Sequence, residues 1–274
     1  MTIGEWVARA EICLKEAGVN SPRLEARLLA ATVLDSDWTT IFAHPEWELD
    51  ERHADQLLTR RASREPLAYI LGWREFYGRR FTVTPAVLIP RQETEVLVDQ
   101  LLEFIGTREE PYVLDLGCGS GCIALTIKLE RPQSSVVGSD ISVEAISIAR
   151  LNANRLMGDI GIIQSDMFTN MDWRRFDYIV TNPPYIADGE ELMPDVALFE
   201  PASALFSGAS GLEFYERLAT EAETFLRPGG RILMEVGHTQ AVKVQGIFEG
   251  ARWRHLKTVK DLSGVDRVLA FSKS

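Results

Sequence analysis

The segment Val113-Leu114-Asp115-Leu116-Gly117-Cys118-Gly119-Ser120-Gly121 predicts a buried strand that runs straight into a glycine-rich turn. Apolar residues from Ile123 to Leu129 then recur at the spacing of a buried helix. Glycines allow positive φ and let the backbone approach a ligand closely. A dinucleotide fingerprint would need glycine at Cys122, and no Gly-Lys-Ser/Thr of a P-loop follows. The turn predicts the ligand-binding edge of an α/β sheet, with an ordinary tight turn as the alternative.

A carboxylate ends the next predicted strand. Asp140 lies about twenty residues beyond the turn, where a carboxylate can accept hydrogen bonds from both ribose hydroxyls of a nucleoside. Asp115 and Asp140 make the surroundings of the turn acidic. Such a site suits the cationic sulfonium of S-adenosylmethionine better than the negatively charged diphosphate of a dinucleotide. Asp166 and Phe168 follow the third strand and are candidates to contact an adenine, although Phe168 fits the core equally well.

A second motif, Asn182-Pro183-Pro184-Tyr185, follows an apolar run that predicts another buried strand. Asn182 offers a side-chain carbonyl and Pro183 a backbone carbonyl, and neither proline presents a competing N–H. Two adjacent acceptors fit a planar NH2 group with its two donors, and Tyr185 adds a flat face for stacking. An ordinary proline-rich turn is the alternative, but the strand and the glycine turn upstream favour a binding site.

Length and composition predict two globular domains without a membrane segment. The chain has 274 residues, of which 46% are hydrophobic and 25% charged, so a sizeable core can form. No apolar run approaches the roughly 20 residues needed to cross a membrane, and the N-terminus lacks the pattern of a signal peptide. Cys13, Cys118 and Cys122 fit no zinc spacing and are expected to be reduced. We therefore expect a cytoplasmic protein without a metal.

The charge balance argues against a partner that is bound through its phosphates. The net charge is −11, and phosphate binding needs clustered Lys and Arg. The one tight basic cluster comprises Arg60, Arg61 and Arg64, for which a solvated helix face is expected. The histidines show no metal or triad spacing and are expected to be surface or structural residues: His44, His53, His238 and His255.

The order of predicted elements indicates an α/β fold with a helical N-terminal domain. Residues 1–75 show only helical patterns, starting with a capping box at Thr2. Residues 76–90 predict a β-hairpin linker that turns near Gly78-Arg79, and residues 91–274 alternate helix and strand. The last two strands have no helix between them and should pair antiparallel at a sheet edge. Strands are predicted at Tyr112–Leu116, Ser135–Asp140, Gly161–Gln164, Tyr178–Thr181, Arg231–Val236, His255–Asp261 and Val265–Phe271.

Short motifs spread over nearly the whole chain carry a family resemblance. They are Pro66–Gly72, Phe76–Gly78, Leu88–Arg91, Glu93–Glu95, Asp115–Gly121, Asn182–Ile186, Phe199–Pro201, Gly229–Leu233 and Glu235–Gly237. Together they resemble the release factor glutamine N5-methyltransferases, a branch of the class I S-adenosylmethionine-dependent methyltransferases. Asn-Pro-Pro-Tyr alone is shared with nucleic-acid amino-methyltransferases, so the segment between the domains is the more specific part. Gln92 stands where the family usually has proline, and Leu198 where it often has a basic residue.

The resemblance implies a seven-stranded, Rossmann-like methyltransferase domain and a small helical domain that helps to recognise a protein substrate. The implied substrate is the glutamine of the Gly-Gly-Gln motif in peptide chain release factors, and the implied cofactor product is S-adenosyl-L-homocysteine. The implied catalytic residues are Asn182, Pro183 and Tyr185, and the implied substrate contacts are Asn182, Pro183, Pro184, Tyr185 and Glu200. The cofactor-binding candidates are Asp115, Gly117, Cys118, Gly119, Ser120, Gly121, Asp140, Asp166, Phe168 and Asn182. We expect a monomer that binds neither nucleic acid nor a membrane.

The acceptor pair suggests a mechanism. A glutamine amide nitrogen is a poor nucleophile because its lone pair is delocalised into the carbonyl. We hypothesise that Asn182 Oδ1 and the Pro183 carbonyl each accept one N–H bond, which orients the nitrogen and favours its pyramidalisation. The lone pair then points at the sulfonium methyl for an in-line displacement. No strong general base is required, because the methylated nitrogen readily loses its proton to water.

Three other functions share some of these features. A nucleic-acid amino-methyltransferase would use the same acceptor pair on an exocyclic amine of adenine or guanine, but the acidic balance opposes it. A non-catalytic adaptor that binds release factor would need neither an intact glycine turn nor Asn-Pro-Pro-Tyr. A nicotinamide dehydrogenase would need a different loop spacing. The nucleic-acid enzyme is therefore the main alternative to a glutamine methyltransferase.

Overall fold

The computed structural model describes residues 1–171 and 174–273. The chain divides into two compact units, each with its own buried apolar core. The first unit comprises Met1–Trp73 and Leu192–Phe199, and the second comprises Arg74–Glu191 and Glu200–Ser274. The inclusion of Leu192–Phe199 in the first unit was not predicted from the sequence. Over the described ranges, we find no helix with the length and apolar character needed to span a membrane.

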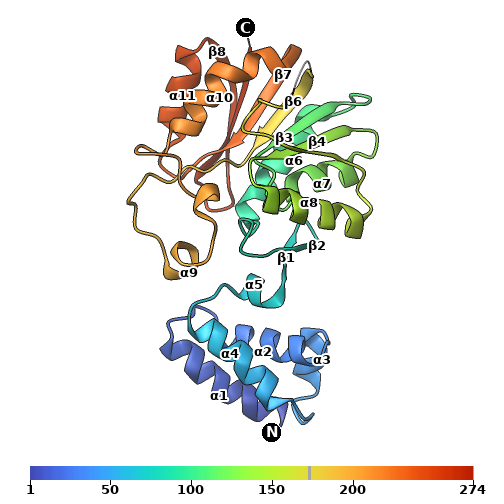
Figure 1. Ribbon diagram of the computed structural model, residues 1–274, viewed down its shortest axis with the longest axis vertical. Helices are drawn as coiled ribbons and strands as arrows, with labels where there is room; N and C mark the ends of the chain where they lie inside the picture. The colour runs from blue at the N-terminus through green and yellow to red at the C-terminus, as the bar shows by residue number, and fades with distance from the viewer. Residues whose placement is uncertain (172–173, 274) are drawn as a thin grey trace. The chain divides into compact units, whose positions relative to one another are not determined.

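The first unit is a bundle of helices (Figure 1). The predicted capping box is present, since the Thr2 side chain accepts from Glu5 N and the Glu5 side chain accepts from Thr2 N. Trp6 fills the core, and its indole N–H donates to Asp55 at 2.8 Å. The helices are α1 (Ile3–Glu16), α2 (Pro22–Val33), α3 (Trp38–Ala43), α4 (Glu51–Ala62), α5 (Leu67–Leu71) and α9 (Pro194–Ala197).

The basic cluster at the end of α4 is only in part the solvated helix face that we expected, since Arg60 is exposed whereas Arg61 is buried. Arg61 is only 5% exposed, and it pairs with Glu25 and with Asp195. Arg64 also pairs with Asp195, which lies on α9 and is far from both arginines in the sequence. A buried charge needs such partners to offset its desolvation. These ion pairs hold Leu192–Phe199 within the helical unit.

A seven-stranded sheet forms the centre of the second unit, as predicted. The strand order is β5-β4-β3-β6-β7-β9-β8; β9 is antiparallel to β7 and β8, and the other pairs are parallel. Asp115 on β3 pairs with Gly138 on β4 and Val180 on β6, so the carboxyl ends of these strands meet at one edge. The strands are β3 (Tyr112–Leu116), β4 (Ser135–Asp140), β5 (Gly161–Gln164), β6 (Phe176–Thr181), β7 (Leu226–Glu235), β8 (Trp253–Lys260) and β9 (Asp266–Lys273).

Several element bounds in this unit differ from the sequence predictions. β6 begins at Phe176 rather than Tyr178, and β8 begins at Trp253 rather than His255. β7 begins at Leu226 rather than Arg231, because Leu226 pairs with Phe176 ahead of a register shift. The hairpin of β1 (Trp73–Phe76) and β2 (Arg79–Thr82) turns at Tyr77 and Gly78, one position earlier than predicted. Both turn residues have positive φ, of 52° and 70°, which matches the twist of a tight two-residue hairpin.

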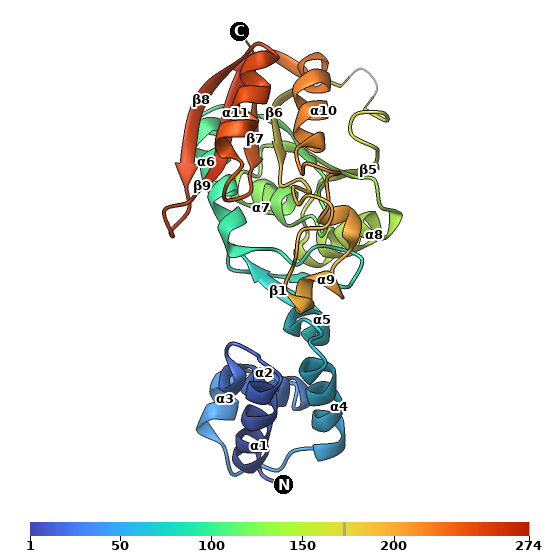
Figure 2. The same ribbon diagram turned by 90° about the vertical axis from the view of Figure 1, so that its left-hand side faces the viewer.

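Helices cover both faces of the sheet (Figure 2). One apolar core lies under α6 (Glu95–Ile105), α7 (Cys122–Glu130) and α8 (Val143–Leu156), and the other lies under α10 (Glu213–Glu221) and α11 (Ala241–Gly250). Short 3-10 turns occur at η1 (Gln92–Thr94), η2 (Ala202–Ala204) and η3 (Ala222–Phe225). This arrangement leaves the carboxyl edge of the parallel strands to the loops.

Asn152 on α8 ties the hairpin to the glycine turn. Its Oδ1 accepts from Thr82 N at 2.7 Å, and its Nδ2 donates to Thr82 O at 3.0 Å and to Ser120 O at 2.9 Å. The side chain is 1% exposed, so water cannot replace these bonds. Asn152 therefore fixes β2 against the turn that follows β3.

We predict that Asn152→Ala lowers the free energy of unfolding by about 3 kcal/mol, because it leaves the buried Ser120 carbonyl and the partly buried N–H and C=O of Thr82 without the Asn152 side chain. Urea denaturation followed by circular dichroism would measure the change. Asn154→Ala removes an exposed asparagine from the same helix and is the matched control, with an expected change below about 0.5 kcal/mol. Equal destabilisation by the two variants would contradict the role of Asn152.

Candidate active site

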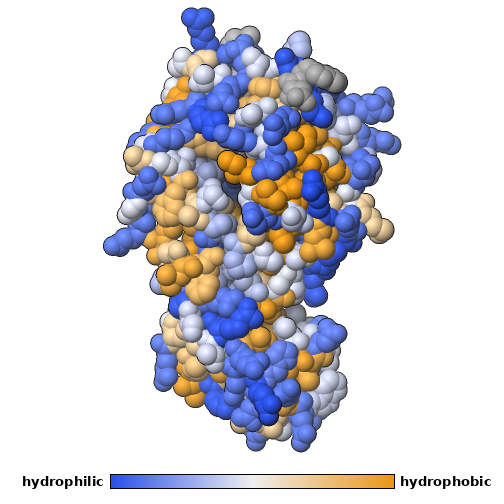
Figure 3. Space-filling view, in the orientation of Figure 1, coloured by the Kyte–Doolittle hydropathy of each residue, from blue (hydrophilic) through white to orange (hydrophobic). Residues whose placement is uncertain are grey.

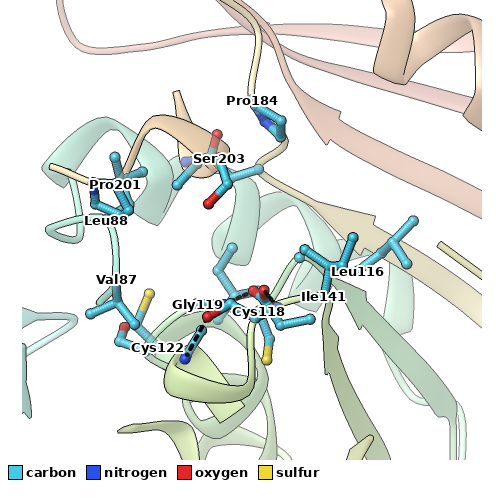
Figure 4. A pocket seen from close by; sticks show the side chains of 18 of the residues that line it. Val87, Leu88, Leu116, Cys118, Gly119, Cys122, Ile141, Pro184, Pro201 and Ser203 are labelled. Atoms are coloured by element: carbon cyan, nitrogen blue, oxygen red, sulfur yellow. Dashed lines mark hydrogen bonds between the residues drawn. The ribbon is translucent and has the colours of Figure 1, made fainter. Parts of the chain in front are cut away.

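A cavity of about 230 Å³ opens at the carboxyl edge of the sheet in the second unit. Figure 4 shows Pro184 and Ser203 across this cavity from Cys118 and Gly119. The two sequence motifs therefore contribute to the same site. The predicted residues that line it are Gly117, Cys118, Gly119, Ser120, Asp140, Asp166, Asn182 and Pro184.

The glycine turn is anchored to the neighbouring strand. The N–H groups of Gly117 and Cys118 both donate to Ser139 O at 2.8 Å. Gly121 has a φ of +80°, and a Cβ there would lie 3.3 Å from the Cβ of Ala149. Glycine is thus favoured at position 121 mainly by its backbone conformation, and the close Ala149 leaves little space for a side chain. The turn has one defined path, which exposes its backbone to the cavity.

Asp140 is held in the cavity wall by backbone donors. Its Oδ2 accepts from Gly119 N at 2.9 Å, and its Oδ1 accepts from Ser142 N at 3.0 Å. Burial raises the pKa of this carboxyl, and the two N–H donors oppose that rise. Each carboxylate oxygen can accept a second bond, so both remain open to hydroxyl donors of a ligand. This geometry fits the predicted contact with a ribose.

Asn182 presents an unused acceptor at the exit of β6. Its Nδ2 donates to Thr94 Oγ1 at 3.1 Å. Its Oδ1 is buried and has no hydrogen-bond partner among the described residues. A buried acceptor without a partner costs about 1–3 kcal/mol, which the protein recovers when a ligand N–H completes the bond. The Asn182 carbonyl is therefore a free acceptor at a cavity that Asn182 helps to line.

The side chain of Gln240 fixes the end of the Asn-Pro-Pro-Tyr motif through hydrogen bonds to the backbone. Its Nε2 donates to Tyr185 O at 2.8 Å and to Gly211 O at 3.3 Å, while its Oε1 accepts from Gly237 N at 3.2 Å. A Cβ at Gly211 would lie 2.5 Å from Tyr185 O, so only glycine permits this close approach. These contacts fix the path of the chain beyond Pro184.

Several predicted site residues lie outside the cavity lining. Phe168 is 3% exposed and stacks on Phe225 at 4.5 Å, so its place is the core rather than the predicted adenine contact. Tyr185 packs against the same core, and burial raises its pKa to about 12. Its phenol therefore stays protonated and does not act as a base. Other predicted residues behind the lining are Asp115, Gly121, Pro183 and Glu200.

Glu200 shapes a wall of the cavity instead of facing it. It is 7% exposed, its Oε2 accepts from Ile89 N at 3.2 Å, and its Oε1 accepts from Arg91 at 2.5 Å. This wall contributes Leu88, which belongs to the motif Leu88–Arg91, and Val87, which the sequence analysis did not single out. Sequence reasoning missed other lining residues, namely Ile141, Ser142, Ser203, Phe214 and Arg217.

The carboxyl group of Asp115 lies directly behind the glycine turn. It is fully buried, its Oδ2 accepts from Ala124 N at 3.0 Å, and its Oδ1 has no partner among the described residues. Burial, with a smaller contribution from the charge of Asp140, raises the pKa of Asp115 to about 7. The acids on either side of the turn, Asp115 buried and Asp140 partly buried, favour a cationic ligand. Nowhere in the described ranges do three His, Cys, Asp or Glu side chains gather as a metal site would require.

Comparison with known proteins places this site in a family. Residues 92–208 match the profile of the Methyltransferase small domain, and residues 5–72 match that of the PrmC N-terminal domain. A release factor glutamine methyltransferase of Koribacter versatilis is 42% identical over 100% of this chain and 99% of that protein. One from Geobacter sulfurreducens is 40% identical over 93% of this chain and 91% of that protein. The chain belongs to the release factor glutamine methyltransferase family.

The family and the methyltransferase activity predicted from the sequence are thereby confirmed, and the nucleic-acid alternative is not favoured. Solved structures support the fold alone. A methyltransferase from Pyrococcus furiosus has a TM-score of 0.54 at 17% identity, covering 81% of this chain and 98% of its own. The hMettl16 catalytic domain has a TM-score of 0.56 at 16% identity, covering 80% of this chain and 82% of its own.

We predict that Asp115 makes the ligand-free protein less stable as the pH rises. Its pKa is about 7 in the folded state against 3.8 in its ordinary state, so the unfolded chain loses the proton first. Stability is therefore lost between about pH 4 and pH 7, by up to about 4 kcal/mol. Asp115→Asn removes this loss and keeps an acceptor for Ala124 N.

Denaturant midpoints of wild type and Asp115→Asn across pH 5 to 8 would test this, with the difference growing as the pH rises. Asp188→Asn, at an exposed carboxylate, is the control and should track wild type at every pH. Parallel curves for wild type and Asp115→Asn would contradict the prediction.

Proposed function

We propose that this protein transfers a methyl group from S-adenosylmethionine to the side-chain amide nitrogen of the glutamine in the Gly-Gly-Gln motif of peptide chain release factors. The observation that carries the proposal is the buried Oδ1 of Asn182, which has no partner in the described part of the chain and shares a cavity with the glycine turn. A primary amide supplies the N–H donors that this acceptor lacks. Because release factors act in translation, the reaction takes place in the cytoplasm, and we propose that a monomer performs it.

The residues present fit an adenosyl sulfonium. Asp140 offers acceptors to ribose hydroxyls, and the backbone of Gly117–Ser120 can lie close to the ligand. Asp166 and Met167 line the cavity beyond β5, where the adenine is proposed to lie. The acids Asp115 and Asp140 favour the positive charge. When bound, S-adenosylmethionine supplies an electrophilic methyl group.

The residues of the chain act mainly by holding the amide nitrogen. Asn182 Oδ1 and the Pro183 carbonyl are proposed to accept one N–H bond each, which restricts the rotation of the amide. Alignment of two reactants contributes about 7–11 kcal/mol in well-oriented systems. Acceptors aimed at the nitrogen also stabilise the positive charge that develops on it. Positioning and electrostatics thus replace a general base.

We predict that Asn182→Ala lowers kcat for methyl transfer to release factor by about 10²–10³-fold, since removal of one preorganised hydrogen-bonding group has an effect of that size. Transfer of labelled methyl would measure the rate, and calorimetry should show binding of S-adenosylmethionine within a few-fold of wild type. Asn154→Ala is the control. A release factor whose Gly-Gly-Gln glutamine is replaced by alanine should accept no label, and labelling of both substrates would refute the assignment.

We further propose that the chain functions as a helical domain of residues 1–75, a hairpin linker of residues 76–90 and a catalytic domain of residues 91–274. The helical domain is proposed to recognise the protein substrate. Figure 3 shows apolar residues among hydrophilic ones on its surface. Two exposed aromatic side chains of this domain are Trp38, at 49% exposure, and Phe42, at 61%. Exposed aromatic residues are preferred anchors in protein interfaces.

We predict that the double variant Trp38→Ser, Phe42→Ser raises KM for release factor about tenfold and leaves kcat unchanged, because it removes binding contacts remote from the chemistry. Steady-state kinetics with full-length release factor would measure both constants. Leu262→Ser, at a fully exposed leucine of the second unit, is the matched control. An unchanged KM in the double variant would exclude this surface.

A further inference from the structure

A buried chain of hydrogen bonds leads from the catalytic motif into the protein. Thr94 Oγ1 accepts from Asn182 Nδ2 at 3.1 Å and donates to Glu235 Oε2 at 2.6 Å. Thr94 is 2% exposed and Glu235 is 1% exposed, so water does not compete for these bonds. The three side chains come from η1, from the exit of β6 and from the end of β7.

The sheet register explains why these residues meet. Thr181 pairs with Met234, so Asn182 and Glu235 lie next to each other at the ends of adjacent strands. Side chains alternate along a strand, so Glu235 points to the same face as Leu233, which packs in the core under α6. Thr94 immediately precedes α6 and reaches the carboxylate from that face.

The charge of the Glu235 carboxylate determines which group donates and which accepts in each of these two hydrogen bonds. An ionised Glu235 can only accept, so the Thr94 hydroxyl must donate to it. The oxygen of Thr94 is then an acceptor, and only the NH2 end of the Asn182 amide can satisfy it. The carbonyl end is thereby turned away from Thr94, and no residue within 1–171 or 174–273 hydrogen-bonds to it.

We propose that Thr94 and Glu235 are positioning residues that lock the Asn182 amide with Oδ1 directed at the substrate. This inference rests on the proposed function, in which Oδ1 accepts from the glutamine amide. An asparagine amide is nearly symmetric in shape, so packing alone does not distinguish its two orientations. The hydrogen-bond polarity imposed by Glu235 supplies that distinction.

The lock depends on the charge of Glu235. Burial raises the pKa of Glu235 to about 7, and the charge of Glu93 adds to the rise, whereas Thr94, Arg267 and Arg91 lower it. The other titratable groups facing this carboxyl are the phenols of Tyr185 and Tyr215. A protonated Glu235 can donate to Thr94, which frees the threonine hydroxyl to donate to Asn182 Oδ1 after a flip of the amide. The substrate acceptor is then lost, so kcat should fall as the pH drops through about 7.

The first experiment removes the threonine hydroxyl from the full-length enzyme. We expect Thr94→Val to lower kcat for release factor about 10- to 100-fold, as misorientation of a catalytic group does. Binding of S-adenosylmethionine and KM should stay within about threefold of wild type. Thr94→Ser restores the hydroxyl and should recover most of the rate. Thr126→Val removes another buried threonine hydroxyl, one without a partner in the described structure, and should leave kcat unchanged.

Two further measurements separate positioning from a general effect on folding. In an Asn182→Ala background, Thr94→Val should change kcat less than about twofold, because the group that it positions is already gone. The side chain of Glu235→Gln cannot ionise. The kcat of this variant should therefore not decrease as the pH drops through about 7, whereas the kcat of wild type should. Two results would overturn the proposed positioning role. One is a kcat of the double variant that falls by the product of the two single effects, and the other is a kcat of Glu235→Gln that still decreases below about pH 7.

The wild-type control distinguishes this inference from the function on which it rests. If wild type does not label the Gly-Gly-Gln glutamine, the proposed function itself fails, and the lock falls with it. If wild type labels that glutamine and Thr94→Val retains the wild-type kcat, the proposed function stands and only the positioning role of Thr94 and Glu235 is refuted.

Discussion

The parallel pairing of β3 between β4 and β6 is the constraint on which the site depends. It places the glycine turn, Asp140 and Asn182 at one edge of the sheet, although they are widely spaced in the sequence. Parallel strands need crossover helices, and these helices cover both faces of the sheet and leave its carboxyl edge free. The same register continues through β7 and brings Glu235 beside the Asn-Pro-Pro-Tyr motif. The positions of the glycine turn, of Asn182 and of Glu235 at this edge of the sheet therefore follow from one strand arrangement.

Much of the fold and part of the site were predictable because their signals are local. The glycine turn, the strand ending at Asp140 and the strand before Asn182 each combine an apolar run with the polar residue that terminates it. Phe168 was ambiguous, since an aromatic residue after a strand fits a ligand or a core, and the structure places it against Phe225. From the sequence, Asp115 was expected to contact the ligand. In the structure, its carboxylate accepts a hydrogen bond from a backbone N–H in the first turn of α7.

The features that the sequence did not reveal are contacts between distant segments. Glu200 with Arg91, Arg61 with Asp195 and Thr94 with Glu235 each join residues with no shared periodicity. A buried charge looks like any surface charge until its partner is known, and for this reason Arg61 was expected on a solvated face. Pairing of this kind is a property of the tertiary structure, so neither propensity nor spacing predicts it.

The assignment of Leu192–Phe199 to the helical unit has a consequence for biosynthesis. Ribosomes release a chain from its N-terminus, so residues 1–73 emerge long before Asp195. Until Asp195 is translated, Arg61 and Arg64 lack a carboxylate that pairs with both in the finished protein. The helical unit is thus completed only after most of the catalytic sheet has been synthesised, and a fragment that stops at residue 73 would carry a nearly buried arginine without one of its two counterions.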